Sequence, residues 1–415
     1  MSIPNVTRNP FMVLQSNWDE VLWQNNGKAW VYLKHPVNAT VHGDITNVDG
    51  QSNIRVAEGF KVETMEKHSI TLSFPQYCLT INFIAPVAVF SNIHKNNIGA
   101  MDVSIGGGLG VSASRDETLV IWDTKSGSVR RKLEGHFGEV ECCNFFPSGV
   151  VVISGGMDTQ MKIWSAEDGT CARTISGVHK RPIRCIAIVD KGRNIISCSA
   201  DGTVRLWDCG SASEIACLVK DREEINCCSI TTITKDLPKE FLCEIEDTDS
   251  RSELEVGTEN KLLIIGCENG NIEGYHVGCR KQLFSLQLQN PVNCCCFVND
   301  RLVAAGCQNG TIHIIDLHET SAPILTDSST ESHVLSMHPS NICKDQPSFW
   351  VGFANGRCAL MKVVASDKRS QSLKIVHELT GPDCDAVYEV TEANDGFVYT
   401  ACRDGSVRKY KCPSS

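Results

Sequence analysis

Three segments of the chain each carry a histidine, a serine, an aspartate and a tryptophan at one fixed spacing. Serine, histidine and aspartate are the residue types of a hydrolase triad, so these segments could carry nucleophilic chemistry. The intervals from the histidine to the serine and to the aspartate are the same in every copy, and the tryptophan always stands six residues after the aspartate. The three sets are His94, Ser112, Asp116 and Trp122; His136, Ser154, Asp158 and Trp164; and His179, Ser197, Asp201 and Trp207.

The threefold repetition favours a structural role for these sets. An enzyme rarely keeps three identical triads, and the chain has no nucleophile elbow of the G-x-S-x-G kind. A hydrogen-bond network that ties the loops of a repeated unit together explains the fixed spacing better. We therefore interpret the three sets as structural tetrads, and we expect no catalytic residue and no enzyme activity.

The step of six residues from a turn residue to a large side chain continues along the chain. It links Asn269 to Tyr275, Asn309 to Ile315, Asn355 to Met361, and Asp404 to Tyr410. In five of the seven copies a glycine follows the turn residue, and Asp-Gly or Asn-Gly between two apolar runs indicates a β-hairpin. The tryptophans of the first three copies recur within the period of about 40–45 residues that is typical of a WD-repeat blade. The repeat predicts an all-β fold, a seven-bladed WD-repeat β-propeller.

The two ends of the repeat region predict how the ring closes. After the last motif, RDGSVRKYKC, too few residues remain for the outer strand of blade seven. Residues 87–90 stand just ahead of the first blade, where the outer strand of a preceding blade stands elsewhere in the repeat. We therefore expect them to be the outer strand that completes blade seven. Residues 1–85 show no blade motif and predict a small α+β domain, ahead of a propeller at 86–415.

One departure from the period is a long acidic insertion at residues 236–260. The step from Trp207 to Tyr275 exceeds a blade period by the length of this insertion, which holds nine acidic residues against two basic ones. A net charge of -7 in this segment is most of the -10 of the whole chain. Such a run is either a solvated, mobile loop or a docking surface for a basic partner.

Overall composition narrows the class of partner and the compartment. A net charge of -10 with a pI near 5.7 argues against nucleic acid and fits a basic protein partner. The N-terminus lacks the layout of a secretory signal, and no apolar run is long enough to span a membrane. We expect a soluble, cytoplasmic protein, with the nucleus as a second compartment, that is a monomer on its own and binds neither nucleic acid nor membrane.

The 22 cysteines could indicate disulfides or zinc, but their positions favour core packing. They recur in short apolar strands such as VECCNF, INCCSI and VNCCCF. Neighbouring residues of a strand point to opposite faces, so adjacent cysteines cannot share one tetrahedral metal. We expect buried free thiols, no metal and no cofactor.

Several stretches are more specific than the repeat itself. The stretches in the blades are FFPSGVVVISGGMDTQMKIWSAEDGTC, AIVDKGRNIISCSADGTVRLWDCG and TACRDGSVRKY, and those outside the blade motifs are SNWDEVL, AEGFKV, VGTENKLLI and LTGPDCDAVYEV. Both in the blade motifs and outside them, the chain resembles the proteasomal ATPase-associated factor family. This family comprises WD-repeat assembly chaperones of the proteasome regulatory particle. The likeness extends over essentially the whole chain.

The resemblance implies a non-enzymatic interaction protein. Members of the family bind the C-terminal region of one ATPase subunit of the regulatory-particle base. They act on assembly of the base and limit the association of the regulatory particle with the core particle. A general WD-repeat scaffold or a substrate-receptor propeller is the alternative function.

The resemblance also implies an acidic surface on the propeller. WD propellers usually bind partners on the face that carries the loops ahead of the first strands. The residues just before these strands are acidic at Glu139, Glu224 and Asp385, with Glu223 and Asp383 beside them. We expect these five to form the partner-binding site, although ordinary solvated loop acids would give the same pattern.

Overall fold

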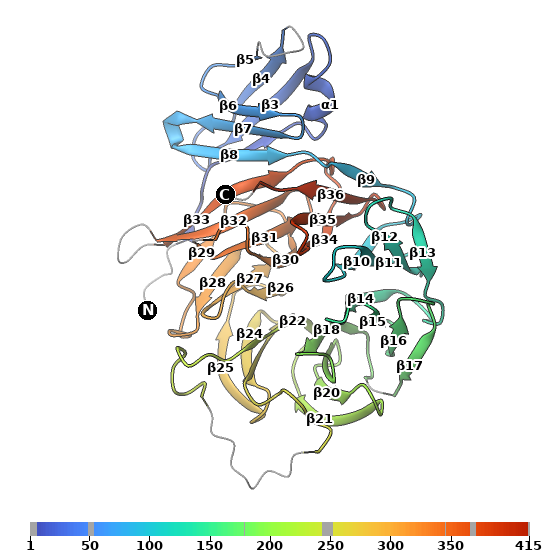
Figure 1. Ribbon diagram of the computed structural model, residues 1–415. Helices are drawn as coiled ribbons and strands as arrows, with labels where there is room; N and C mark the ends of the chain where they lie inside the picture. Colours follow the sequence, from blue (N-terminus) through green and yellow to red (C-terminus); the bar gives the residue numbers. More distant parts are fainter. Residues whose placement is uncertain are drawn as a thin grey trace.

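The computed structural model shows a ring of seven sheets around a central channel, with an N-terminal sheet over one side of the ring (Figure 1). It describes residues 6–48, 54–177, 179–242, 252–344, 346–365 and 371–413. The seven-bladed all-β fold predicted from the repeat is confirmed. No helix in the described part of the chain is both long and apolar enough to cross a membrane.

The first four blades are four-stranded antiparallel sheets, each contributed by consecutive strands. Their strands are β10 (Ile98–Val103), β11 (Leu109–Ser114), β12 (Leu119–Asp123) and β13 (Val129–Lys132); β14 (Val140–Phe145), β15 (Val151–Gly156), β16 (Met161–Ser165) and β17 (Cys171–Ile175); β18 (Ile183–Val189), β19 (Asn194–Ser199), β20 (Val204–Asp208) and β21 (Ser213–Val219); and β22 (Ile225–Thr232), β23 (Lys261–Cys267), β24 (Asn271–His276) and β25 (Lys281–Gln287).

Blades five to seven take strands from the N-terminal side as well. Their own strands are β26 (Val292–Phe297), β27 (Leu302–Cys307), β28 (Ile312–Asp316) and β29 (Leu325–Asp327); β30 (Val334–Ser340), β31 (Ser348–Phe353), β32 (Cys358–Ala365) and β33 (Gln371–Leu379); and β34 (Val387–Glu392), β35 (Phe397–Cys402) and β36 (Val407–Lys411). The outer strand of blade seven is β9 (Ala88–Phe90), which pairs antiparallel with β36.

Strands from the described part of residues 1–85 share sheets with the propeller rather than forming a wholly separate unit. The strand β1 (Val6–Thr7) pairs parallel with β29 in blade five. The strand β8 (Leu79–Ile84) pairs parallel with β33, and it is followed outward by β7 (Ser69–Phe74) and β6 (Lys61–Glu66), so blade six becomes part of a seven-stranded sheet. A boundary between residues 85 and 86 therefore separates strands that are hydrogen-bonded to one another.

A second N-terminal sheet packs on these strands. It has the order β2 (Phe11–Leu14), β3 (Lys28–Lys34), β4 (Val41–Asn47) and β5 (Ile54–Val56), and the short helix α1 (Trp18–Leu22) joins its core. The indole of Trp18 is fully buried and donates a hydrogen bond to Thr380 Oγ1 at 3.0 Å, which ties this layer to the end of blade six, just after β33.

The main hydrophobic cores of the ring lie between adjacent blades. Trp122, Trp164 and Trp207 each pack against the preceding blade, and Trp122 lies in the core between blades one and seven with Tyr399 and Val407. Because the blades contact only their neighbours, each tryptophan stabilises one joint of the ring.

Candidate partner-binding face

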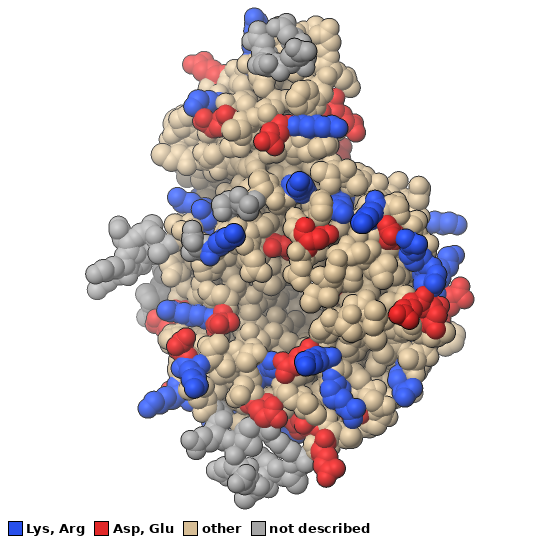
Figure 2. Space-filling view, viewed as in Figure 1, with Lys and Arg blue, Asp and Glu red and all other residues tan. Residues whose placement is uncertain are grey.

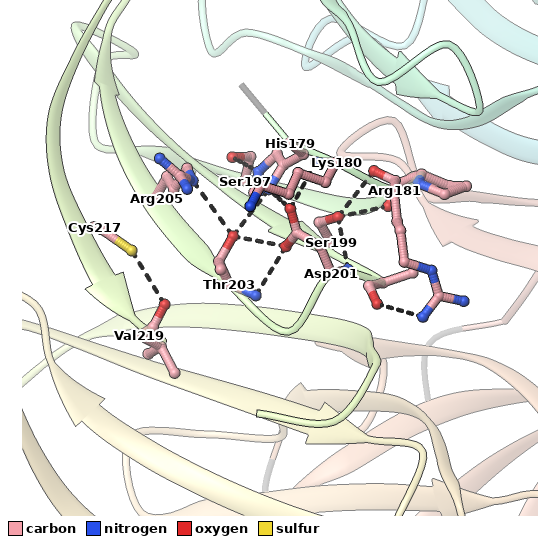
Figure 3. Close-up of polar contacts among 12 residues, drawn as sticks. His179, Lys180, Arg181, Ser197, Ser199, Asp201, Thr203, Arg205, Cys217 and Val219 are labelled. Atoms are coloured by element: carbon pink, nitrogen blue, oxygen red, sulfur yellow. Dashed lines mark hydrogen bonds and ion pairs between the residues drawn. The ribbon is translucent and has the colours of Figure 1, made fainter. Parts of the chain in front are cut away.

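Each tetrad forms one connected hydrogen-bond network inside its blade. In blade three, His179 Nε2 lies 2.7 Å from Ser197 Oγ and His179 Nδ1 lies 3.1 Å from Asp201 Oδ2 (Figure 3). Trp207 Nε1 donates to the same Ser197 oxygen at 2.9 Å. Nδ1–H therefore faces the carboxylate, and Nε2 accepts the serine hydroxyl proton.

The same contacts recur in blade two and change in blade one. His136 lies 2.7 Å from Ser154 and 2.8 Å from Asp158. In blade one His94 Nδ1 bonds Thr118 Oγ1 at 2.8 Å and Asp116 is 3.7 Å away, whereas in blade three the equivalent Thr203 hydroxyl lies 3.0 Å from His179 Nδ1 in addition to the aspartate.

The environment of the serines excludes the triad chemistry that their spacing suggests. Ser112, Ser154 and Ser197 are completely buried, and each Oγ already accepts an indole N–H. A nucleophile must reach its substrate, which these hydroxyls cannot do. Burial also lowers the pKa of the histidines, against the opposing effect of the neighbouring aspartates, and this favours the neutral imidazole of a structural network.

The aspartates of the tetrads hold the loops ahead of the first strands. Asp116, Asp158 and Asp201 accept backbone N–H groups at 2.9–3.1 Å from the residues that follow the three histidines, which are Lys95, Phe137 and Lys180. Each aspartate thus ties the loop before the first strand to the turn between the second and third strands. These loops and turns lie at one end of the propeller, which we call the turn face.

The predicted acidic residues lie on the turn face, and three of them are paired with arginines. Glu139 accepts Arg115 Nε at 2.9 Å, and Asp385 accepts Arg403 Nε at 3.0 Å. Glu224 forms an ion pair with Arg181. All three carboxylates are about one-third exposed, so each presents an ion pair to solvent rather than a bare negative charge.

Glu223 and Asp383 differ from the other three. Both are exposed, and their side chains make no ion pair or hydrogen bond with any residue that the structure describes. Their charge is free to attract a partner, since nothing in the described structure neutralises it.

The arginines that pair with these acids are not among the residues predicted from the sequence. In blades one and seven the arginine directly precedes the turn aspartate, as in Arg115-Asp116 and Arg403-Asp404, and this placement was the available signal. Arg184 and Glu141 form a further pair at 3.0 Å at the mouth of the channel. Figure 2 shows acidic and basic side chains interspersed over the visible face of the ring, so this face carries mixed charge rather than one acidic field.

The central channel has a volume of about 880 Å³ and is lined by the first strands of all seven blades. Burial raises the pKa of Glu389 in this channel to about 8 and that of Asp102 to about 6. In the described residues, no group of three or more histidine, cysteine or acidic side chains could hold a metal ion.

The described parts of the acidic insertion pack against the opposite face of the propeller. Leu237 and Phe241 are buried in the core between blades four and five. Glu255 is buried and pairs with Arg280 at 2.7 Å. These segments are therefore part of the folded structure, whereas residues 243–251 lie outside the described residues.

Comparison with known proteins agrees with this fold. The family model "WD domain, G-beta repeat" matches residues 127–165, 169–208 and 280–316. The solved "Structure of U3-55K" superimposes with a TM-score of 0.63 at 14% identity, over 79% of this chain and 98% of that one, which supports the propeller fold alone.

Curated relatives extend over the whole chain. Proteasomal ATPase-associated factor 1 of Gallus gallus is 39% identical over 96% of this chain and 97% of its own length, and that of Homo sapiens is 38% identical over the same shares. The 26S proteasome regulatory subunit RPN14 of Saccharomyces cerevisiae is 34% identical over 50% of each chain. Because the first two relatives match along nearly all of both chains, this protein belongs to the proteasomal ATPase-associated factor 1 family.

Proposed function

We propose that this protein is a non-enzymatic chaperone of the proteasome regulatory particle, which binds the C-terminal region of one ATPase subunit of the base. The observation that supports this proposal most is the full-length similarity to relatives named for association with a proteasomal ATPase. The turn face supports it too, because it presents acidic groups to solvent, and one of them, Glu139, lies on a loop that a tetrad holds in place.

The proposed binding site comprises Glu139, Glu223, Glu224, Asp383 and Asp385. Within it Glu223 and Asp383 supply the long-range attraction for a basic partner, since neither side chain is paired in the described structure. Glu139, Glu224 and Asp385 offer carboxylates that exchange an intramolecular arginine for a basic side chain of the partner. Binding of the ATPase subunit here would limit association of the regulatory particle with the core particle.

Charge reversal tests the site with little risk to the fold. We expect Glu223→Lys/Asp383→Lys to weaken binding of a purified ATPase C-terminal region about 10-fold or more, about 1.4 kcal/mol, and to reduce the salt dependence of binding. The matched control is Glu167→Lys/Asp300→Lys, which changes the charge equally at exposed positions on the opposite face. If the control pair weakens binding and the turn-face pair does not, the partner docks on the opposite face.

The paired acids form a second arm of the test. Reversing Glu139, Glu224 and Asp385 to lysine places each new cation beside an arginine, so we expect a further loss of affinity and a modest loss of stability. Deleting residues 243–251 should leave binding unchanged. We also propose that the free protein is a monomer of the cytoplasm and nucleus, which light scattering and fractionation would test.

A further inference from the structure

The inner strands of blades three, four and five bring cysteine thiols together in pairs. Cys185 of β18 and Cys228 of β22 have their sulfurs 3.2 Å apart, and Cys227 of β22 and Cys295 of β26 have theirs 3.4 Å apart. Each pair joins two neighbouring blades. The same pairing occurs twice because the first strands of consecutive blades lie side by side around the channel. In each pair, a cysteine of one first strand faces the residue one position further along the first strand of the next blade.

The pair of Cys185 and Cys228 is the more accessible of the two. Both side chains are only partly buried and both line the central channel of about 880 Å³. Formation of a disulfide bond requires the two sulfurs to approach by about 1 Å, which is within the range of side-chain rotation. Cys185, Cys228, Cys227 and Cys295 are all free thiols.

We propose that Cys185 and Cys228 form a disulfide across the joint between blades three and four when the protein meets a peroxide or a small disulfide oxidant. With hydrogen peroxide, the two thiols give up two electrons and two protons, one S–S bond forms, the O–O bond breaks, and two molecules of water leave. Cys227 and Cys295 form the same bond more slowly, since both are buried.

The surroundings of the thiols set the rate of this reaction. The hydrogen bond with Cys228, followed by burial, raises the pKa of Cys185 well above its usual value. The thiolate is the reactive species, so oxidation is slow at neutral pH and becomes faster as the pH rises. Sustained exposure to an oxidant, rather than a brief pulse, is the condition that modifies this site.

The same joint carries part of the turn face. Arg181 and Glu224 stand just ahead of β18 and β22, and they form the ion pair at the end of these two strands. A disulfide between Cys185 and Cys228 would fix the spacing of the two strands close to this ion pair. Oxidation therefore fixes the contact between blades three and four next to the part of the turn face that carries Arg181 and Glu224.

Peptide mapping of the full-length protein tests the proposal. Reduced protein is treated with hydrogen peroxide for several hours, free thiols are alkylated, and the digest is analysed by mass spectrometry without reduction. We expect a peptide that links Cys185 to Cys228 with the loss of two hydrogens. We also expect Tm to rise by about 2–6 °C in the oxidised protein, as joining two strands of adjacent blades restricts the unfolded chain.

Cys142 supplies a matched control. It occupies the position of Cys185 in blade two, but it packs against Ile186 instead of a second thiol. The variant Cys142→Ser should oxidise and gain Tm as the natural protein does, whereas Cys185→Ser and Cys228→Ser, checked for folding by circular dichroism, should do neither. If the exposed Cys78 and Cys171 oxidise while Cys185 and Cys228 stay reduced, the proposal is wrong.

Discussion

Phe90 of β9 lies opposite Val407 of β36 in the outer strand pair of blade seven. Phe90 and Val407 also share one hydrophobic core with Trp122 of blade one. The ring is thus closed by hydrogen bonds and by apolar packing at the same place, because a segment from before the first blade completes the sheet of the last.

Truncation should separate closure of the ring from the N-terminal layer. Deleting residues 1–95 removes β9 and Phe90, so we expect loss of cooperative thermal unfolding. Deleting residues 1–80 keeps β9 and the part of β8 that pairs with β33, but it removes β7 and so uncovers the other edge of β8. We therefore expect a cooperative transition with reduced solubility. Equal cooperativity of the two truncated proteins in circular dichroism melts would show that β9 does not close the ring.

The tetrad of blade two should contribute stability and no catalysis. Asp158 accepts His136 at 2.8 Å and the N–H of Phe137 at 3.1 Å. Asp158→Ala should therefore lower the free energy of unfolding by about 1.5–3 kcal/mol. The exposed Glu167→Ala serves as the control and should change it by less than about 0.5 kcal/mol. Urea denaturation measures both, and a hydrolase activity lost in Ser154→Ala would contradict the structural role.

The hairpin turn of blade two should be strained. Thr159 has a φ of +61°, at the position where blade three has Gly202 with a φ of +76°. A β-branched residue is disfavoured in this region, so Thr159→Gly should raise the free energy of unfolding by about 1 kcal/mol. The reverse change, Gly202→Ala, should destabilise the protein, because an added Cβ would collide with the carbonyl oxygen of Arg222. Denaturation midpoints that move the other way would contradict this account.

Glu389 should make stability depend on pH. Its pKa of about 8 in the folded protein lies above the ordinary 4.5, so the folded state keeps a proton that the unfolded state has lost. The stability contributed by the neutral acid is present below about pH 4.5 and is lost as the pH rises through 8. Glu389→Gln imitates the protonated form and should raise Tm relative to the natural protein more at pH 8 than at pH 5. An equal change in Tm at pH 5 and at pH 8 would show instead that the carboxylate of Glu389 lies in a polar environment that does not raise its pKa.

Local features made much of the fold readable from the sequence. The turn at Asp201-Gly202 and the tryptophan six residues later lie within one hairpin, so their geometry depends on short-range turn chemistry. Counting such hairpins predicts the number of blades. Blade seven lacks an outer strand of its own, so its open edge is expected to pair with residues 87–90.

The partners of the site residues were decided only by tertiary structure. Arg181 meets Glu224, Cys185 meets Cys228, and β8 meets β33 across distances in sequence that no local pattern spans. These contacts depend on the register between first strands of neighbouring blades and on where the N-terminal strands join the ring. The repeated blade and its internal network are predictable from the sequence, because those interactions are set by turns and a fixed spacing. The charge balance of the turn face and the pairing of thiols follow from packing between blades, because it brings together side chains that the repeat places in separate units.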